Sequence, residues 1–187
     1  IYMTPVSLTQ FIKTPIDQFS IGEGHVLGLD SQLSKALSSG RGTEGQLGDG
    51  SLNNRANFDF VMQLKELQGF AIVAAGHRFS VFVTPQHEQY FFGKLGKVLA
   101  RLPLQFNALE LKGEAISQVK CGIEYIFTLT ASGKIFVNHV DEFDIGPAFQ
   151  LQVSQQQQQQ QHLIDSIIVE DFTHFFAITR RGDVITW

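Results

Sequence analysis

One short loop collects side chains of the kind that bind metal ions. It contains one imidazole and three carboxylates within six residues, namely His139, Asp141, Glu142 and Asp144. A calcium loop has a different ligand spacing, and a zinc site draws nitrogen or sulfur ligands from fixed elements. The loop has neither the calcium spacing nor a second histidine on such an element. We therefore expect no metal site here.

Two histidines occupy equivalent places in similar apolar runs. His25 and His174 each begin such a run, and Phe79 and Tyr125 hold the same place in two further runs. An exchange between imidazole and other aromatic rings indicates packing, with at most one turn hydrogen bond, rather than proton transfer. The single cysteine, Cys121, stands at a small apolar position, which is typical of a buried and unreactive thiol.

Other polar groups have ordinary structural interpretations. The glycine-rich stretch 40–50 reads GRGTEGQLGDG, which lacks the lysine and following helix of a phosphate-binding loop. His77 and Arg78 lie in a polar loop, where exposure is the expected state and a binding role is the alternative. The acidic residues Asp165, Glu170 and Asp171 fit a solvated rim, so they add no catalytic pair.

No reaction centre emerges from these residues. No serine or cysteine stands with a base and an orienting acid in a recognisable spacing. We predict a protein that is not an enzyme, with no catalytic residues, no cofactor-binding residues and no metal ligands.

Charge and hydropathy exclude two further classes of partner. The net charge is −4, the 14 Lys and Arg residues are scattered, and the one adjacent basic pair is Arg180-Arg181. A nucleic-acid groove needs a basic stripe or aromatic platforms flanked by cations, so direct nucleic-acid binding is not expected. No apolar stretch approaches the roughly 20 residues that span a bilayer. We expect no membrane span.

The elements that carry these residues repeat along the chain. Four segments share one pattern, a short apolar run, a turn and a second apolar run, with markers at Gly22, Gly76, Gly122 and Asp171. The markers are 54, 46 and 49 residues apart. A period near 50 with short strands is typical of propeller blades. The small sheet predicted for each segment is apolar on both faces, so neighbouring blades must cover those faces.

The runs predict strands rather than helices. They are four to seven residues long and rich in Val, Ile, Phe, Tyr and Thr. The Thr-x-x-Gly segments at Thr130–Gly133 and Thr179–Gly182 predict hairpin turns. The expected inter-blade set consists of Val73, Val81, Val83, Val119, Phe127, Leu129, Ile168, Phe176 and Ile178.

Loops of unequal length separate the strands. The glycine-rich loop is followed by a polar, mobile stretch at 51–57 and then by a candidate outer strand at 58–64. The equivalent loop of the second unit shrinks to 93–96. A Gln-rich low-complexity insertion occupies 154–162, where we expect a disordered surface loop.

These motifs resemble the repeats of the regulator of chromosome condensation (RCC1) family. The likeness is greatest from Gly40 to Ser80, where a GQLG-type loop and a VAAG-type strand follow in the family's order and spacing. Trp187 stands at the family's Trp-Gly position, although Ser39, Phe92 and Asn138 replace the tryptophan in the other units.

The resemblance implies an all-β fold of about four RCC1-like blades, part of a seven-bladed ring. It covers 1–187, with repeat strands near 19–37, 73–92, 119–137 and 168–187. Four blades are about half of such a ring, so we expect the natural chain to be longer.

Function follows from the resemblance only at a general level. We expect a non-catalytic propeller that acts as a protein–protein interaction scaffold in a larger assembly. The alternatives are guanine-nucleotide exchange on a small GTPase, and an accessory propeller of a kinase or ubiquitin ligase. The lone cysteine favours a reducing, intracellular location, cytoplasmic or cytoskeleton-associated, with the nucleus as the alternative.

Overall fold

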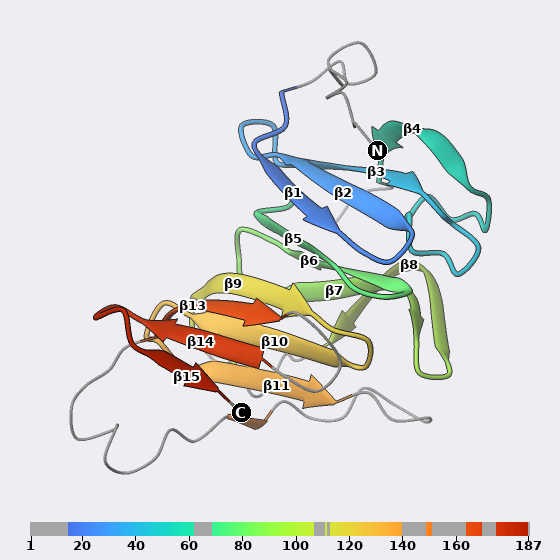
Figure 1. Cartoon of the computed structure of the whole chain (residues 1–187). Coiled ribbons are helices and arrows are strands. Elements are labelled where there is room, and N and C mark those ends of the chain that lie inside the picture. The colour runs from blue at the N-terminus through green and yellow to red at the C-terminus, as the bar shows by residue number, and fades with distance from the viewer. Residues whose placement is uncertain are drawn as a thin grey trace, which may run out of the picture.

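The computed structural model describes residues 15–61, 69–106, 111, 113–139, 149–150, 164–169 and 175–186. Throughout these residues the chain forms strands, turns and loops, and no helix is present. The described strands build four separate antiparallel sheets (Figure 1).

Each sheet is a simple meander of consecutive strands. Sheet 1 contains β1 (Gln18–Ile21), β2 (His25–Asp30), β3 (Lys35–Gly40) and β4 (Arg55–Phe60). Sheet 2 contains β5 (Ile72–Ala75), β6 (Phe79–Val83), β7 (Gln89–Leu95) and β8 (Val98–Phe106). Sheet 3 contains β9 (Ile116–Cys121), β10 (Tyr125–Thr130), β11 (Ile135–His139) and β12 (Phe149–Gln150). Sheet 4 contains β13 (Ile164–Val169), β14 (Phe175–Thr179) and β15 (Val184–Thr186).

The sheets stack in chain order, with their first strands side by side. Strand β1 contacts β5, β5 contacts β9, and β9 contacts β13. Figure 1 shows sheet 1 in blue at one end of the stack and sheet 4 in red at the other. Short meanders stacked around their first strands are the blades of a β-propeller. The sequence-based prediction of an all-β fold of about four blades is confirmed.

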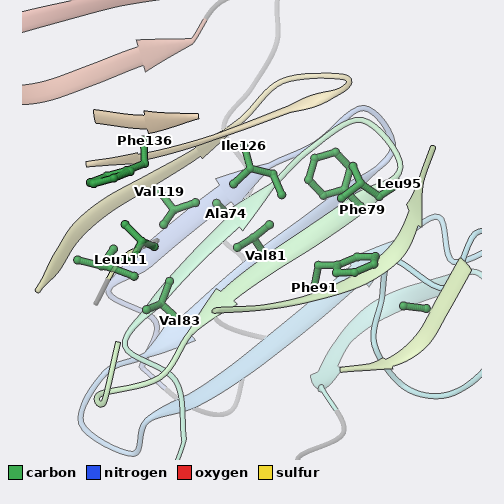
Figure 2. Close-up of a cluster of buried hydrophobic side chains, with 12 residues drawn as sticks. Ala74, Phe79, Val81, Val83, Phe91, Leu95, Leu111, Val119, Ile126 and Phe136 are labelled. Atoms are coloured by element: carbon green, nitrogen blue, oxygen red, sulfur yellow. The ribbon is translucent and has the colours of Figure 1, made fainter. Parts of the chain in front are cut away.

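Apolar side chains fill the three junctions between sheets. The first junction holds Leu27, Leu29, Ala36, Val61, Phe70, Val73, Ala75, Phe82 and Phe92. The second includes Ala74, Phe79, Val81, Val83, Phe91, Val119, Ile126 and Phe136, and Figure 2 shows these side chains meeting between the ribbons. The third holds Phe127, Leu129, Ile135, Val137, Ile164, Ile167, Ala177 and Ile185. Alternation along each strand sends every second side chain to the opposite face, so each inner sheet serves two junctions.

Aromatic rings dominate the first junction. Phe82 lies between Phe70 and Phe92, with ring centroids 4.9 and 4.7 Å away. All three side chains are fully buried. Such pairs add about 0.5–1.5 kcal/mol each beyond the burial of their surface, so they stabilise the face of sheet 2 that packs on Leu27 and Leu29 of sheet 1.

The predicted inter-blade residues are correct in sheets 2 and 3. Six of them, from Val73 to Leu129, are buried. In sheet 4 the prediction is wrong for Ile168, which is 40% exposed, while its neighbour Ile167 is buried. Four residues separate β13 from the run that begins at His174, whereas three residues separate β9 from β10 in sheet 3. A register counted back from that run therefore slips by one residue, which assigns each side chain of β13 to the opposite face.

Phe176 and Ile178 are half-buried rather than buried. They lie on the face of sheet 4 that points away from sheet 3, because Phe175 and Ala177 occupy the face toward it. The expected alignment of β14 with the earlier repeats is therefore right, but in the described residues no further sheet packs on that face.

Two loop boundaries differ from the sequence-based expectation. β4 begins at Arg55 and ends at Phe60, so the polar stretch 51–57 is already strand at its end. The expected short loop 93–96 is largely strand, since β7 continues to Leu95 and turns tightly into β8. In both cases a β-bulge, next to Gly40 or Gly93, lets polar or glycine-containing segments stay paired.

The predicted Thr-x-x-Gly turns are confirmed. The amide of Gly133 donates to the carbonyl of Thr130, and the amide of Gly182 donates to that of Thr179, both at 2.9 Å. Both glycines have positive φ, which a side chain would resist. The Gln-rich segment 154–162 and Trp187 lie outside the described residues.

Candidate functional site

Three equivalent turns lie at the same end of their sheets, where the first strand of each sheet ends. They join β1 to β2 at 22–24, β5 to β6 at 76–78, and β9 to β10 at 122–124. Each begins with a glycine whose amide donates to the carbonyl three residues later, at 2.8–2.9 Å. The amide of Arg41 donates to the carbonyl of Gly24 at 2.7 Å, which brings the loop 41–54 to the same end. We call this set of turns and loop the turn rim.

The three turns of the rim line a pocket of about 350 Å³. Three repeats contribute the same positions, Ile21-Gly22-Glu23, Ala75-Gly76-His77 and Cys121-Gly122-Ile123, and sheet 4 adds Val169. The pocket is therefore built by the repeat itself, at the place where the first strands of all four sheets end.

Two of these glycines have no room for a side chain. A Cβ on Gly22 would lie 2.3 Å from the carbonyl oxygen of Gly76, and one on Gly76 would lie 2.6 Å from the ring of Phe79. At Gly122 the nearest atoms are 3.8 Å away. Gly22 thus allows sheets 1 and 2 to approach closely, Gly76 makes room for the Phe79 ring within sheet 2, and Gly122 has space around it.

His25 is buried behind the pocket and joins sheets 1 and 2. Its Nε2 lies 2.8 Å from Ser80 Oγ, and Ser80 Oγ donates to the carbonyl of Gln46 at 2.8 Å. Because the Ser80 proton is used in that bond, Nε2 carries the imidazole proton and donates. Nδ1 is buried and has no hydrogen-bond partner among the described residues. Burial, helped by nearby His77, lowers the pKa of His25 to about 4.

This placement agrees with a packing role for His25, although its hydrogen bond crosses to the next sheet instead of closing a turn. The equivalent Phe79 and Tyr125 lie at the next two junctions. His174 lies outside the described residues.

His77 and Glu23 form the polar side of the pocket. His77 Nε2 lies 2.9 Å from Glu23 Oε2, and the Arg41 guanidinium lies 4.0 Å from the same oxygen. Glu23 and Arg41 are more than two-fifths exposed. One carboxylate between two basic side chains makes a mixed surface rather than a catalytic pair.

The long loop of the rim is held in place by specific bonds. Arg55 binds Asp49 at 2.6 Å, Ser38 Oγ donates to the carbonyl of Leu47 at 2.8 Å, and Asn54 Oδ1 accepts from the amide of Gly42 at 3.0 Å. Burial alone would raise the pKa of Asp49, but hydrogen bonds from Ser51 and the charge of Arg55 outweigh it and lower that pKa. The glycine-rich sequence therefore forms a packed platform.

Cys121 lines the pocket without being a candidate nucleophile. Its Sγ lies 3.9 Å from the carbonyl oxygen of Ala74. The residue is partly exposed, but burial of the thiol raises its pKa far above the usual range. A thiol that stays protonated at neutral pH reacts slowly.

Of the four residues considered as metal ligands, the structure describes His139 alone. His139 ends β11 and lies 4.8 Å, centroid to centroid, from Tyr125, while Asp141, Glu142 and Asp144 lie outside the described residues. Within the part of the chain that the structure describes, no three His, Cys, Asp or Glu residues gather as metal ligands would. Likewise, that part contains no helix able to cross a membrane.

Of the acidic set and the basic pair, the structure describes Asp165, Arg180 and Arg181. Asp165 is exposed on β13, and Glu170 and Asp171 lie outside the described residues. Arg180 and Arg181 are exposed in the turn between β14 and β15, at the end of the sheets opposite the turn rim.

Several polar residues that sequence reasoning overlooked connect the sheets. Gln89 Nε2 donates to Thr128 Oγ1 at 2.8 Å, and Gln118 Oε1 accepts from the amide of Ile167 at 2.8 Å. Ser20 Oγ accepts from the amide of Ala75 at 2.8 Å. The sequence feature that could have identified them is a polar residue inside an apolar strand, since such a residue must find a hydrogen-bond partner when it is buried.

The fold is an arc of propeller blades, and solved structures similar to it include RCC1-type propellers. Human WBSCR16 superposes with a TM-score of 0.73 at 18% sequence identity over 94% of this chain. Prp20p from Saccharomyces cerevisiae superposes with a TM-score of 0.74 at 15% identity over 95%. The resemblance seen in the sequence motifs is confirmed at the level of the fold.

The chain spans less than half of these proteins, 48% of WBSCR16 and 46% of Prp20p. The receptor-kinase ectodomain of ACR4 from Arabidopsis thaliana is less similar, with a TM-score of 0.57 at 13% identity, covering 93% of this chain and 50% of that one. No protein-family model matches the sequence, and no curated protein matches it significantly. The solved structure of Prp20p was reported together with the binding of Prp20p to Gsp1p and histones.

Proposed function

We propose that the chain is a non-catalytic blade arc whose turn rim binds protein partners within a larger assembly. The observation that carries this proposal is the loop 41–54, which is exposed in part yet held in one conformation by the Asp49–Arg55 pair and by backbone bonds. Loops fixed on a rigid sheet framework are the usual place for recognition.

The charge of the rim favours a protein partner. Glu23, Arg41 and His77 place both signs of charge within one contact network around an apolar pocket. A polyanion would require a single-sign basic surface, and the chain as a whole has a net charge of −4. A mixed polar border around an apolar centre is the arrangement found in protein interfaces.

The polar and titratable side chains beside the turn rim have structural roles, which supports binding rather than catalysis. His25 holds two sheets together, Arg55 holds the loop, and the thiol of Cys121 is kept protonated. The single cysteine suits a reducing, intracellular location, in the cytoplasm, on the cytoskeleton or in the nucleus.

Guanine-nucleotide exchange is the second candidate function, because Prp20p shares the fold and binds Gsp1p. At 15% identity this likeness transfers the fold alone. A nucleotide-release assay against a panel of small GTPases separates the two: the scaffold proposal predicts no acceleration, and specific acceleration of one GTPase would replace it.

Partner capture with matched variants tests the scaffold proposal. Glu23→Lys reverses a charge on the turn rim, and Glu114→Lys reverses an equally paired carboxylate, bound to Lys134, at the opposite end of the sheets. We expect Glu23→Lys to lose partners that wild type and Glu114→Lys retain, with unchanged thermal unfolding. Equal retention by both variants would show that the turn rim is not the binding surface.

A further inference from the structure

Sheet 2 carries a group of basic side chains that lie apart in the sequence. It stands between sheets 1 and 3, which pack on its two faces, so its exposed residues concentrate in its turns and on its last two strands. Four of these exposed residues are cations, and together with an exposed leucine they form what we call the cationic patch: Arg78, Lys94, Lys97, Leu99 and Arg101.

Backbone pairing brings most of the patch together. The amide of Lys94 donates to the carbonyl of Arg78 at 2.9 Å. Register pairs Lys94 with Leu99, and Lys97 lies in the tight turn that joins β7 to β8. Directly opposite residues of an antiparallel pair share a face, so Lys94 and Leu99 project on the same side. This is the side of sheet 1, because Phe92, two residues before Lys94, packs in the first junction.

The loop 41–54 of sheet 1 borders the patch at Arg101. A Cβ on Gly45 would lie 3.2 Å from the carbonyl oxygen of Ala100 and 3.7 Å from the Cγ of Arg101. The same loop adds the half-buried Glu44 beside the patch. The backbone beneath the patch is therefore fixed twice, by strand pairing in sheet 2 and by the packed loop of sheet 1.

The positive charge of the patch exceeds what its surroundings neutralise. In the described part of the chain no ion pair joins Arg78, Lys94 or Arg101 to a carboxylate. Glu44 is the carboxylate that the bordering loop supplies. The net charge of the whole chain is −4, so this gathering of cations does not follow from a basic composition.

We propose that the cationic patch binds an acidic segment of a partner protein, one in which Asp and Glu residues flank an apolar residue. The inference rests on the proposed function, because Arg78 belongs to the turn rim, and it names the chemistry of the partner. Carboxylates of the segment pair with the arginines and lysines. Its apolar side chain packs on Leu99, which is 46% exposed. Opposite charges across an interface select the partner and speed its association.

Leu99 and Glu44 favour a polypeptide over a nucleic acid. A nucleic-acid strand presents a regular row of phosphates, so an exposed leucine within the patch and a carboxylate on its border would both lie against negative charge. The patch also contains no aromatic ring on which a base could stack.

Fluorescence anisotropy tests the proposal on the purified chain. The probe is a labelled peptide of Glu and Asp residues with one central leucine. We expect saturable binding that weakens about tenfold in Lys94→Glu and in Arg101→Glu, since each replacement turns an attraction into a repulsion. Arg180→Glu is the matched control, because it changes the net charge equally in an exposed turn at the opposite end of the sheets. It should bind within about twofold of wild type, because salt screens distant charges.

The apolar contact has its own matched pair of variants. Leu99→Ser should weaken binding of the peptide about threefold, because a partly buried leucine contact is lost. Leu104 is also 46% exposed on β8, but it pairs with Phe91, which faces sheet 3. Leu104→Ser should therefore retain the wild-type affinity. Circular dichroism confirms that each variant is folded.

Losses confined to the patch variants support the inference. No binding by wild type, equal loss in Arg180→Glu, or unchanged affinity in Leu99→Ser would each overturn it. Tighter binding of a poly-dT oligonucleotide than of the peptide would also overturn it and identify a nucleic acid as the ligand. If the inference fails while partner capture still depends on Glu23, the proposed function of the turn rim stands.

Discussion

Replacing His25 by phenylalanine should remove a specific pH dependence from the stability of the fold. In the folded chain burial lowers the pKa of His25 to about 4, whereas an unfolded histidine titrates near 6.5. As the pH falls below 6.5, the unfolded chain takes up a proton that the folded chain refuses. Stability is therefore lost between pH 6.5 and 4 and levels off below. The linkage amounts to about 3 kcal/mol between pH 7 and pH 4.

The structure makes His25→Phe a conservative test. Phe79 occupies the equivalent position in sheet 2 and lies against Gly76 as His25 lies against Gly22. Ser80 keeps its bond to the carbonyl of Gln46 in the variant. The free energy of unfolding is measured by urea titration, followed by circular dichroism, at several pH values from 7 to 4. Carboxylates also titrate in this range, so the informative quantity is the difference between wild type and variant.

We expect wild type to lose about 3 kcal/mol more than His25→Phe over this range. Tyr125→Phe, at the equivalent position in sheet 3, is the control and should retain the wild-type slope. Equal slopes for wild type and His25→Phe would refute the reasoning, because His25 would then be solvated or paired through Nδ1 in the folded state.

Three further predictions concern packing and reactivity. Gly22→Ala should destabilise the fold by about 1–3 kcal/mol, because its Cβ would strike the backbone of Gly76. Gly122→Ala has space around it and should change the free energy of unfolding by no more than about 0.5 kcal/mol. Urea unfolding measures both variants, and equal losses would contradict the close-approach role of Gly22. Phe82→Ala should cost about 3–5 kcal/mol in the same assay, and a loss below 1 kcal/mol would show that the first junction is not packed as described. The thiol of Cys121 should react with iodoacetamide far more slowly in the folded chain than in urea, and equal rates would show that it is not buried.

The fold was accessible from the sequence because the repeat is written in apolar runs and turns. The 46- to 54-residue period, the Thr-x-x-Gly turns and the GQLG and VAAG segments all depend on local chemistry, and each predicts the same blade. Local agreement of this kind locates strands well. It also explains why all six predicted inter-blade residues of sheets 2 and 3 are buried.

The errors arose where one residue changes a face or where a contact is distant in sequence. The paired residues Val169 and Phe175 are one residue further apart in sequence than the pair Cys121 and Ile126, so the prediction placed Ile168 on the wrong face of its strand, since side chains alternate with a period of two. The bond between His25 and Ser80 joins residues 55 apart, and the pocket gathers turns from separate repeats. Neither contact has a local sequence signal.

Cross-sheet proximity is the most direct test of the stacked-blade account. Methyl-labelled chain should give nuclear Overhauser effects across all three junctions: between Leu27 and Val73, between Val81 and Ile126, and between Leu129 and Ile167. Cross-peaks confined to residues of the same sheet would contradict the stacked arc and the turn rim that depends on it.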